Sequence, residues 1–124
     1  MTFVKINNTL YPTIEINGYM VDHNWNGRAS KSITLEMSID SAKELFINDA
    51  EWFIVEQNPV SSYVEDPETE SMILVQKIDE RIYENSNYSV AGDIIDHRNG
   101  VITVKMGMPT ADELLEMLLE GVFQ

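Results

Sequence analysis

The chain has 124 residues, of which 44% are hydrophobic and none is cysteine. This length predicts one domain, residues 1–124, and the lack of cysteine excludes disulfides and thiolate catalysis. Its 21 acidic and 8 basic residues give a formal net charge of −13, which disfavours direct binding to nucleic-acid phosphates or anionic lipid. No apolar run approaches the roughly 20 residues of a membrane span, so we expect a protein made in the cytoplasm that binds no membrane.

Short strands and one helix are predicted in the first part of the chain. Strands are predicted at residues 3–6, 10–16, 32–37 and 51–56, from the alternation of apolar and polar residues at 13–16 and from the apolar run at 52–55. The polar, glycine-containing segment 22–32 is expected to hold turns. Ser38 is expected to cap a short helix. The apolar side of that helix would carry Ile39, Ala42, Leu45 and Phe46.

The middle of the chain is strongly acidic. Residues 57–70 (QNPVSSYVEDPETE) are predicted to form an acidic loop, because two prolines, adjacent serines and four acids disfavour regular structure. A strand at 72–75 and an acidic connection at 79–87 follow. Two interpretations are open: a solvated segment, or a row of negative charge that occupies a basic, nucleic-acid-binding surface of another protein. The row would comprise Glu65, Asp66, Glu68, Glu70, Asp79, Glu80 and Glu84.

The last third of the chain predicts a hairpin followed by a helix. Asn99-Gly100 favours a two-residue turn, which would pair His97 with Ile102 and turn His97 toward the buried face. Thr110 and Glu113 form a capping box that begins an amphipathic helix. Its leucine-rich face is expected to pack on the sheet, with partner binding as the alternative.

The pattern strand–turn–strand–helix occurs twice, beginning at Asp22-His23 and again at Asp96-His97. Aligning the two copies requires a gap, so duplication and chance similarity both remain open. In either case, each copy predicts a hairpin–helix unit. We therefore expect an α+β fold: an antiparallel sheet of about five to six strands with two helices packed on one face.

No arrangement of residues identifies a reaction. The two Asp-His pairs offer ligands of the types that zinc, manganese or iron accept, but neighbouring residues on a strand point to opposite faces. Nucleophile elbows and glycine-rich phosphate loops are absent from the sequence. We expect a protein that is not an enzyme, with no catalytic residues, cofactor or metal.

Trp25 lies in the polar segment DHNWNGR, three residues before Arg28. An exposed tryptophan beside an arginine can anchor a protein interface. The alternative is that Trp25 folds back over the edge of the sheet. We name both residues as candidate partner-binding residues, together with the acids of the middle segment.

The string SITLEMSIDSAKELFINDAEWFIV, taken with YSVAGDIIDHRNGVITVKMGMPTADELLEML, resembles small, acidic, uncharacterised proteins encoded by phages and prophages of low-GC Gram-positive bacteria. The resemblance covers most of the chain outside the acidic loop. It implies a non-enzymatic protein that acts by protein–protein interaction, first of all a virion component in the tail or its assembly. The alternative it implies is an anti-CRISPR-like inhibitor that blocks a basic host protein. The expected location is the host cytoplasm or the virion.

Overall fold

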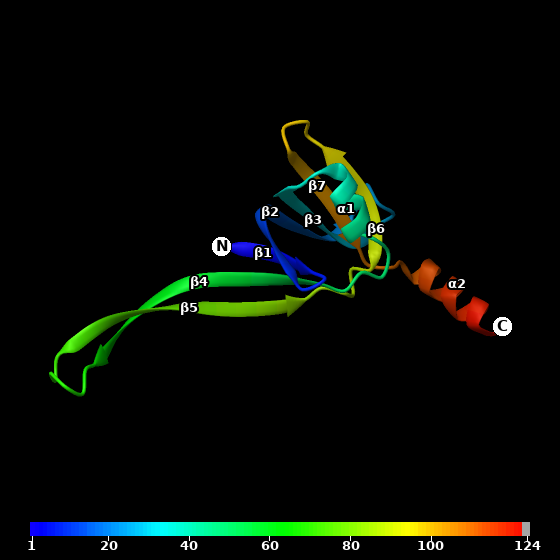
Figure 1. Cartoon of the computed structure of the whole chain (residues 1–124). Coiled ribbons are helices and arrows are strands. Elements are labelled where there is room, and N and C mark those ends of the chain that lie inside the picture. Colours follow the sequence, from blue (N-terminus) through cyan, green and yellow to red (C-terminus); the bar gives the residue numbers. More distant parts are fainter. Residues whose placement is uncertain (123–124) are drawn as a thin grey trace.

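The computed structural model describes residues 1–122 and shows an α+β fold with one seven-stranded antiparallel sheet and two helices (Figure 1). The strands are β1 (Thr2–Ile6), β2 (Thr9–Asp22), β3 (Arg28–Glu36), β4 (Trp52–Glu65), β5 (Met72–Glu84), β6 (Val90–Asp96) and β7 (Val101–Gly107). The helices are α1 (Ile39–Leu45) and α2 (Ala111–Val122). The order in the sheet is β5-β4-β1-β2-β3-β7-β6. The predicted α+β class is confirmed, although the described strands outnumber the five to six expected.

The paired strands β4 and β5 extend far beyond the rest of the sheet (Figure 1). β1 pairs with β4 only as far as Glu56, and the backbone N–H of Gln57 still donates to the carbonyl of Met1. From residue 58 onward, β5 is the one described strand that pairs with β4, and this pairing continues to the pair Glu65–Met72. We call residues 58–79 the arm and the other described residues the body.

The acidic loop predicted at 57–70 is wrong in its first part, because residues 57–65 belong to β4. Pro59 is tolerated there for a geometric reason. Because the N–H of Gln57 points toward β1, the nitrogen of Pro59 points to the same side, past the end of β1. Its missing N–H therefore costs no ladder hydrogen bond. The acidic connection expected at 79–87 is likewise mostly strand, since β5 continues to Glu84.

The two predicted hairpin–helix units lie side by side, joined by the pairing of β3 with β7. Thr34 pairs with Thr103, and their Oγ1 atoms are 2.9 Å apart. On either side of this pair, Ile33 pairs with Val104 and Leu35 pairs with Ile102. Exchanging the two hairpin–helix units would convert one of these pairs into the other, so the ladder is locally pseudo-symmetric. The buried core is built on this ladder. It comprises Val4, Ile6, Ile33, Leu35, Ala42, Phe46, Trp52, Ile54, Ile102, Val104 and Met106.

The predicted register of the β6–β7 hairpin is wrong by one residue. The N–H of His97 donates to the carbonyl of Val101, and Asp96, not His97, pairs with Ile102. The connection holds three residues because Arg98, at φ 62°, joins the turn in the left-handed region. A slip of one residue moves a side chain to the other face of a sheet. His97 is therefore exposed, with Nε2 2.8 Å from Oγ1 of Thr103.

The two helices differ in how they meet the body. Ser38 caps α1 as predicted, accepting a hydrogen bond from the N–H of Ser41, and Ala42 of this helix is fully buried in the core. The expected packing of α2 on the sheet is wrong, because its large apolar residues are exposed. Figure 1 shows α2 leaving the body at the side away from the arm.

We predict that Trp52→Ala destabilises the body strongly. Trp52 is fully buried at the start of β4, and its indole N–H donates to the carbonyl of Tyr88 at 3.1 Å. The free energy of unfolding, measured by urea denaturation, should fall by about 3–5 kcal/mol. Ile14→Ala is the control: this side chain is 60% exposed on β2, so a change within about 0.5 kcal/mol is expected. Equal losses in the two variants would contradict the position of the core.

Candidate functional site

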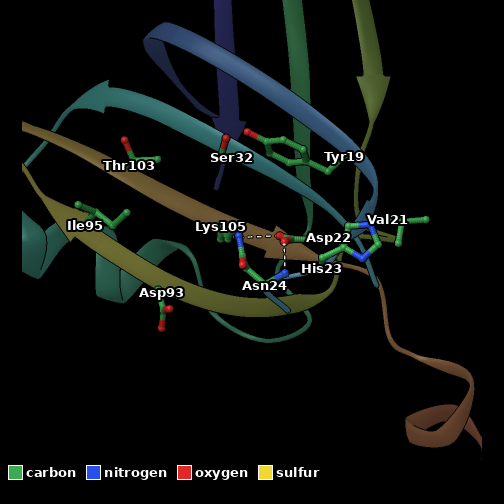
Figure 2. A pocket seen from close by; sticks show the side chains of 10 residues that line it. All are labelled: Tyr19, Val21, Asp22, His23, Asn24, Ser32, Asp93, Ile95, Thr103 and Lys105. Atoms are coloured by element: carbon green, nitrogen blue, oxygen red, sulfur yellow. Dashed lines mark hydrogen bonds and ion pairs between the residues drawn. The ribbon is translucent and has the colours of Figure 1, made fainter. Parts of the chain in front are cut away.

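One cavity, of about 460 Å³, opens beside Asp22 at the end of β2 (Figure 2). Oδ2 of Asp22 lies 2.6 Å from Nζ of Lys105 and accepts a hydrogen bond from the hydroxyl of Ser30 at 2.9 Å. Oδ1 accepts from the backbone N–H of Asn24 at 3.0 Å. These donors, Lys105 first, lower the pKa of Asp22. The negative charge of this carboxylate is therefore already balanced by Lys105 within the body, and its contacts stabilise the fold.

His23 and Asp93 also line this cavity. Within residues 1–122, His, Asp and Glu side chains form no cluster of three that could hold a metal ion. His97, from the second Asp-His pair, bonds to Thr103 on the exposed face of β7. The structure therefore does not bring the two Asp-His pairs together into one site.

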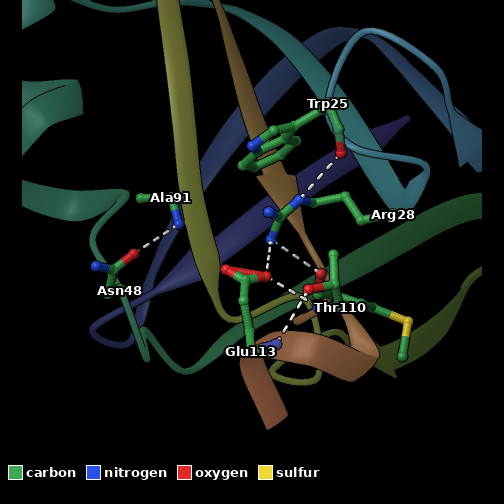
Figure 3. Close-up of polar contacts among 7 residues, drawn as sticks. Trp25, Arg28, Asn48, Ala91, Thr110 and Glu113 are labelled. Carbon is green, nitrogen blue, oxygen red and sulfur yellow. Dashed lines mark hydrogen bonds and ion pairs between the residues drawn. The ribbon is translucent and has the colours of Figure 1, made fainter. Parts of the chain in front are cut away.

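Trp25 folds back over the sheet (Figure 3). Its ring stands where side chains at Gly92 and Gly107 would be, since a Cβ at either position would come within 2.7 Å of the indole. The guanidinium carbon of Arg28 lies 4.6 Å from the ring centroid, and Arg28 is only 6% exposed. The two residues therefore do not form the exposed anchor that the sequence allowed. Their role in binding a partner stays a prediction.

Arg28 instead ties the first turn of α2 to the body (Figure 3). Its Nη1 lies 2.7 Å from Oε1 of Glu113 and 3.3 Å from the carbonyl of Met108. The predicted capping box is confirmed: Thr110 N–H donates to Glu113 at 2.9 Å, and Glu113 N–H donates to the Thr110 hydroxyl at 3.2 Å. The Thr110 N–H, followed by Arg28, lowers the pKa of Glu113. The start of α2 is thus held firmly, although the helix projects.

Beyond this first turn, α2 presents an uncovered apolar side. Each of its exposed large apolar residues has between 47% and 68% of its surface accessible. They are Leu114, Leu115, Met117, Leu118 and Leu119. Acidic residues occupy the other side: Asp112, Glu113, Glu116 and Glu120. The helix is therefore amphipathic, and none of the described elements covers its apolar side.

The arm also exposes large apolar side chains, and it does so on both faces. Paired residues in an antiparallel ladder share a face, so Tyr63 and Leu74 project from one face and Val64 and Ile73 from the other. The exposed apolar residues of the arm are Val60, Tyr63, Val64, Met72, Ile73, Leu74 and Ile78. Ile82 and Tyr83 continue this series along β5 into the body. A two-stranded ribbon that is apolar on both faces cannot bury them within its own chain.

The predicted acidic residues occupy two places on the hairpin. Glu65, Asp66, Glu68 and Glu70 gather at the tip, where Asp66 accepts from the N–H of Glu68 at 3.0 Å. Asp79, Glu80 and Glu84 lie along β5.

On one face of β5, Asp79 lies between Lys77 and Arg81, so the acids of this strand do not form an unbroken negative row. Oδ2 of Asp79 is 3.4 Å from Nε of Arg81, and Glu80 accepts from the side chain of Gln57 at 2.8 Å. Tyr83, followed by Asp79, raises the pKa of Arg81. The sequence identified these acids. It did not lead us to predict that the apolar residues between them form an exposed surface. The spacing of Leu74, Ile78 and Ile82 is the signal that could have revealed it.

Neither of the helices in residues 1–122 is long and apolar enough to cross a membrane. No family model, curated protein or solved structure matches this chain. The candidate functional surfaces are therefore defined by geometry alone: the arm and the apolar side of α2.

We predict that Gly107→Ala destabilises the body through Trp25. The added methyl group would lie 2.7 Å from both the indole ring of Trp25 and Cδ of Arg28, which packs on that ring, so these side chains or the strand must move. The expected loss in unfolding free energy is about 1–3 kcal/mol. In a Trp25→Leu background the same substitution should cost less, and the double-mutant cycle measures the difference. Additive effects would contradict this contact.

We predict that Asp22 stabilises the fold above its pKa. Its pKa is lowered in the folded chain, so its contribution is fully present above the unfolded value, near pH 4, and is lost as the pH falls through the folded value. Asp22→Asn should therefore destabilise the chain at neutral pH, with the difference from the unsubstituted chain shrinking below about pH 4. Urea denaturation across this range provides the measurement, and a difference independent of pH would contradict the ion pair.

Proposed function

We propose that this chain is a non-catalytic structural or assembly subunit of a phage virion, in the tail first of all, that works through contacts with copies of itself. The observation that carries the proposal is the exposure of large apolar side chains on two projecting elements, the arm and α2. The assignment to a virion rests on the resemblance of the sequence to phage-encoded proteins. The projecting elements support the assembly part of the proposal.

The core supplies the first argument for assembly. It is complete without the arm and without α2, because none of its buried residues comes from residues 58–79 or 111–120. These two elements therefore contribute little to the stability of a single copy. Burying one leucine or isoleucine side chain against a partner is worth about 1.5–3 kcal/mol. Soluble monomers rarely leave long apolar surfaces uncovered, so both elements are best explained as contact surfaces.

The placement of the two elements supplies the second argument. The arm and α2 leave the body at different sides (Figure 1), so one copy can contact two neighbours at once. Contacts on different sides of a subunit build rings or filaments, the arrangements from which a repetitive particle is made. A subunit that contacts a single partner would need only one such element.

A second candidate function is an acidic inhibitor that occupies a basic, nucleic-acid-binding surface of a host protein. The observation in its favour is the arm's tip, where four acids, Glu65, Asp66, Glu68 and Glu70, stand at the end of an extended ribbon. No lysine or arginine lies between residues 57 and 76. A concentrated negative charge of this kind can steer the chain toward a basic partner.

We predict that the purified chain self-associates and that Leu115→Ser/Leu118→Ser weakens the association at least about 10-fold, because the serines remove apolar contact area. Glu116→Gln/Glu120→Gln, on the acidic side of α2, is the matched control and should associate as the unsubstituted chain does. Sedimentation velocity over a concentration series, at low salt and at about 0.5 M salt, measures the constants. An apolar interface should change little with salt.

The virion assignment is tested directly by mass spectrometry of phage particles. The particles are purified from the lysate of a culture in which the phage that encodes the chain has replicated. The chain should be a stoichiometric component of the particles. Its presence only in the soluble fraction, together with a monomer in sedimentation, would contradict the proposal. Salt-sensitive binding to a basic host protein, abolished by neutral amides at the four tip acids, would favour the inhibitor instead.

A further inference from the structure

We infer that the free edge of β5 is a self-complementary contact surface: it pairs antiparallel with β5 of a second copy, about a two-fold axis at Ile78. This inference rests on the proposed self-assembly and names one of its contacts. β5 is the last strand of the sheet, and its hydrogen-bonded neighbour among the described strands is β4 alone. The opposite edge of β5 therefore carries an unpaired row of backbone groups.

The hydrogen bonds of the hairpin show which residues form this row. The N–H of Asn85 donates to Trp52, and the N–H of Asp66 donates to Ser71. No register shift interrupts the ladder between these two bonds. Because hydrogen-bonded pairs alternate in an antiparallel ladder, the odd-numbered residues of β5 bond to β4. The even-numbered residues, from Met72 to Glu84, direct their N–H and C=O groups outward.

The other edge of the sheet, β6, is less suited to such pairing. The side-chain oxygen of Asn48 accepts the N–H of Ala91 at 2.8 Å (Figure 3), which occupies a backbone donor on β6. The ladder of β6 is also irregular between Ala91 and Ile94. A bulge and a covering side chain are devices that protect an edge from pairing. β5 has neither, and it is 13 residues long.

The side chains of β5 match a second copy of β5 in one register. Ile78 is the middle residue of the strand, so an axis there pairs the whole strand with its copy. Leu74 of one copy then stands opposite Ile82 of the other, and Ile78 stands opposite its own copy. Each of these three residues is more than half exposed in a single chain, so the pairing buries a continuous apolar row.

The charges select the same register. On the other face of the ribbon, the axis at Ile78 places Lys77 of one copy opposite Asp79 of the other, twice by symmetry. Moving the axis to Lys77 would place two lysines opposite each other. Moving it to Asp79 would oppose two aspartates and place Lys77 opposite Arg81. Like charges directly opposite destabilise a ladder, and opposite charges stabilise it, so the neighbouring registers are disfavoured.

A pair of proline variants tests the edge. At Gln76 a proline removes an outward N–H and blocks the β5 edge, while the bonds to β4 remain. Its cross-strand partner Ser61 points its N–H to the opposite edge of the arm, the edge toward which the ring nitrogen of Pro59 also points, so Ser61→Pro is the matched control. Sedimentation velocity should show dimer association weakened at least about 10-fold by Gln76→Pro and little changed by Ser61→Pro. Equal behaviour of the two variants would overturn the inference.

Charge reversal tests the register. Lys77→Asp alone opposes aspartates across the axis, and Asp79→Lys alone opposes lysines, so each variant should dimerise more weakly than the unsubstituted chain. An equimolar mixture of the two restores both opposite-charge pairs and should recover a heterodimer at the lower concentration where each alone is monomeric. Failure of the mixture to recover association would overturn the proposed register.

A cysteine crosslink gives an independent reading, because the chain has no cysteine of its own. Ile78→Cys should form a disulfide dimer under mild oxidation, since opposed Cα atoms in a ladder lie within disulfide range. Tyr63→Cys is the control, as Tyr63 is 69% exposed like Ile78 but lies near the tip, far from the axis. Equal crosslinking at the two positions would contradict the axis.

These experiments separate the contact from the function on which it rests. If Gln76→Pro still associates while Leu115→Ser/Leu118→Ser does not, self-assembly stands and the β5 contact falls. If the unsubstituted chain stays monomeric up to high micromolar concentration, both fall. Loss of association in Gln76→Pro, together with recovery in the charge-reversal mixture, establishes the contact.

Discussion

The pairing of β3 with β7 is the contact on which the body depends. It joins two hairpin–helix units at their inner strands, with the Thr34–Thr103 hydrogen bond at the centre of a local pseudo-symmetry. Four aliphatic side chains flank this centre on the two strands, and all are at most 1% exposed. Their burial supplies the driving force that the short strands lack individually. The other strands and α1 complete a core whose position this ladder has set.

The pseudo-symmetry ends at the helices, and this has functional consequences. α1 contributes Ala42 to the core, whereas within residues 1–120 the ion pair of Arg28 with Glu113 ties α2 to the body at its first turn. The buried arginine makes the base of α2 rigid while its leucines stay exposed. Rigid presentation lowers the entropy lost when an apolar surface meets a partner. The arm likewise continues from a strand anchored in the body, since Trp52 and Val55 of β4 are buried there.

Much of the body could be predicted from the sequence because its signals are local. The caps at Ser38 and Thr110 and the alternation around Ile33 and Ile102 specify structure within a few residues. The arm could not be predicted in this way. From the sequence alone, Pro59 indicates a break in a strand. It is tolerated because β1 does not extend alongside it, and this is a property of the tertiary structure. The hairpin register failed at Arg98 because a left-handed residue extended the turn by one. Amphipathicity likewise could not show that α2 lacks a covering surface.

The charge of the chain sets a condition on any assembly it forms. Two copies that each carry a net charge of −13 repel one another at long range. Salt screens this repulsion within about 8 Å at physiological ionic strength, while the buried apolar contacts are hardly affected. Salt also weakens the attraction between opposite charges, such as Lys77 of one copy and Asp79 of the other. The loss of attraction and the loss of repulsion therefore offset each other. A charge mimic has no such compensation, because its attraction to a basic partner only declines as salt is added. The sign and steepness of the salt dependence therefore distinguish a chain that contacts itself from one that imitates phosphates.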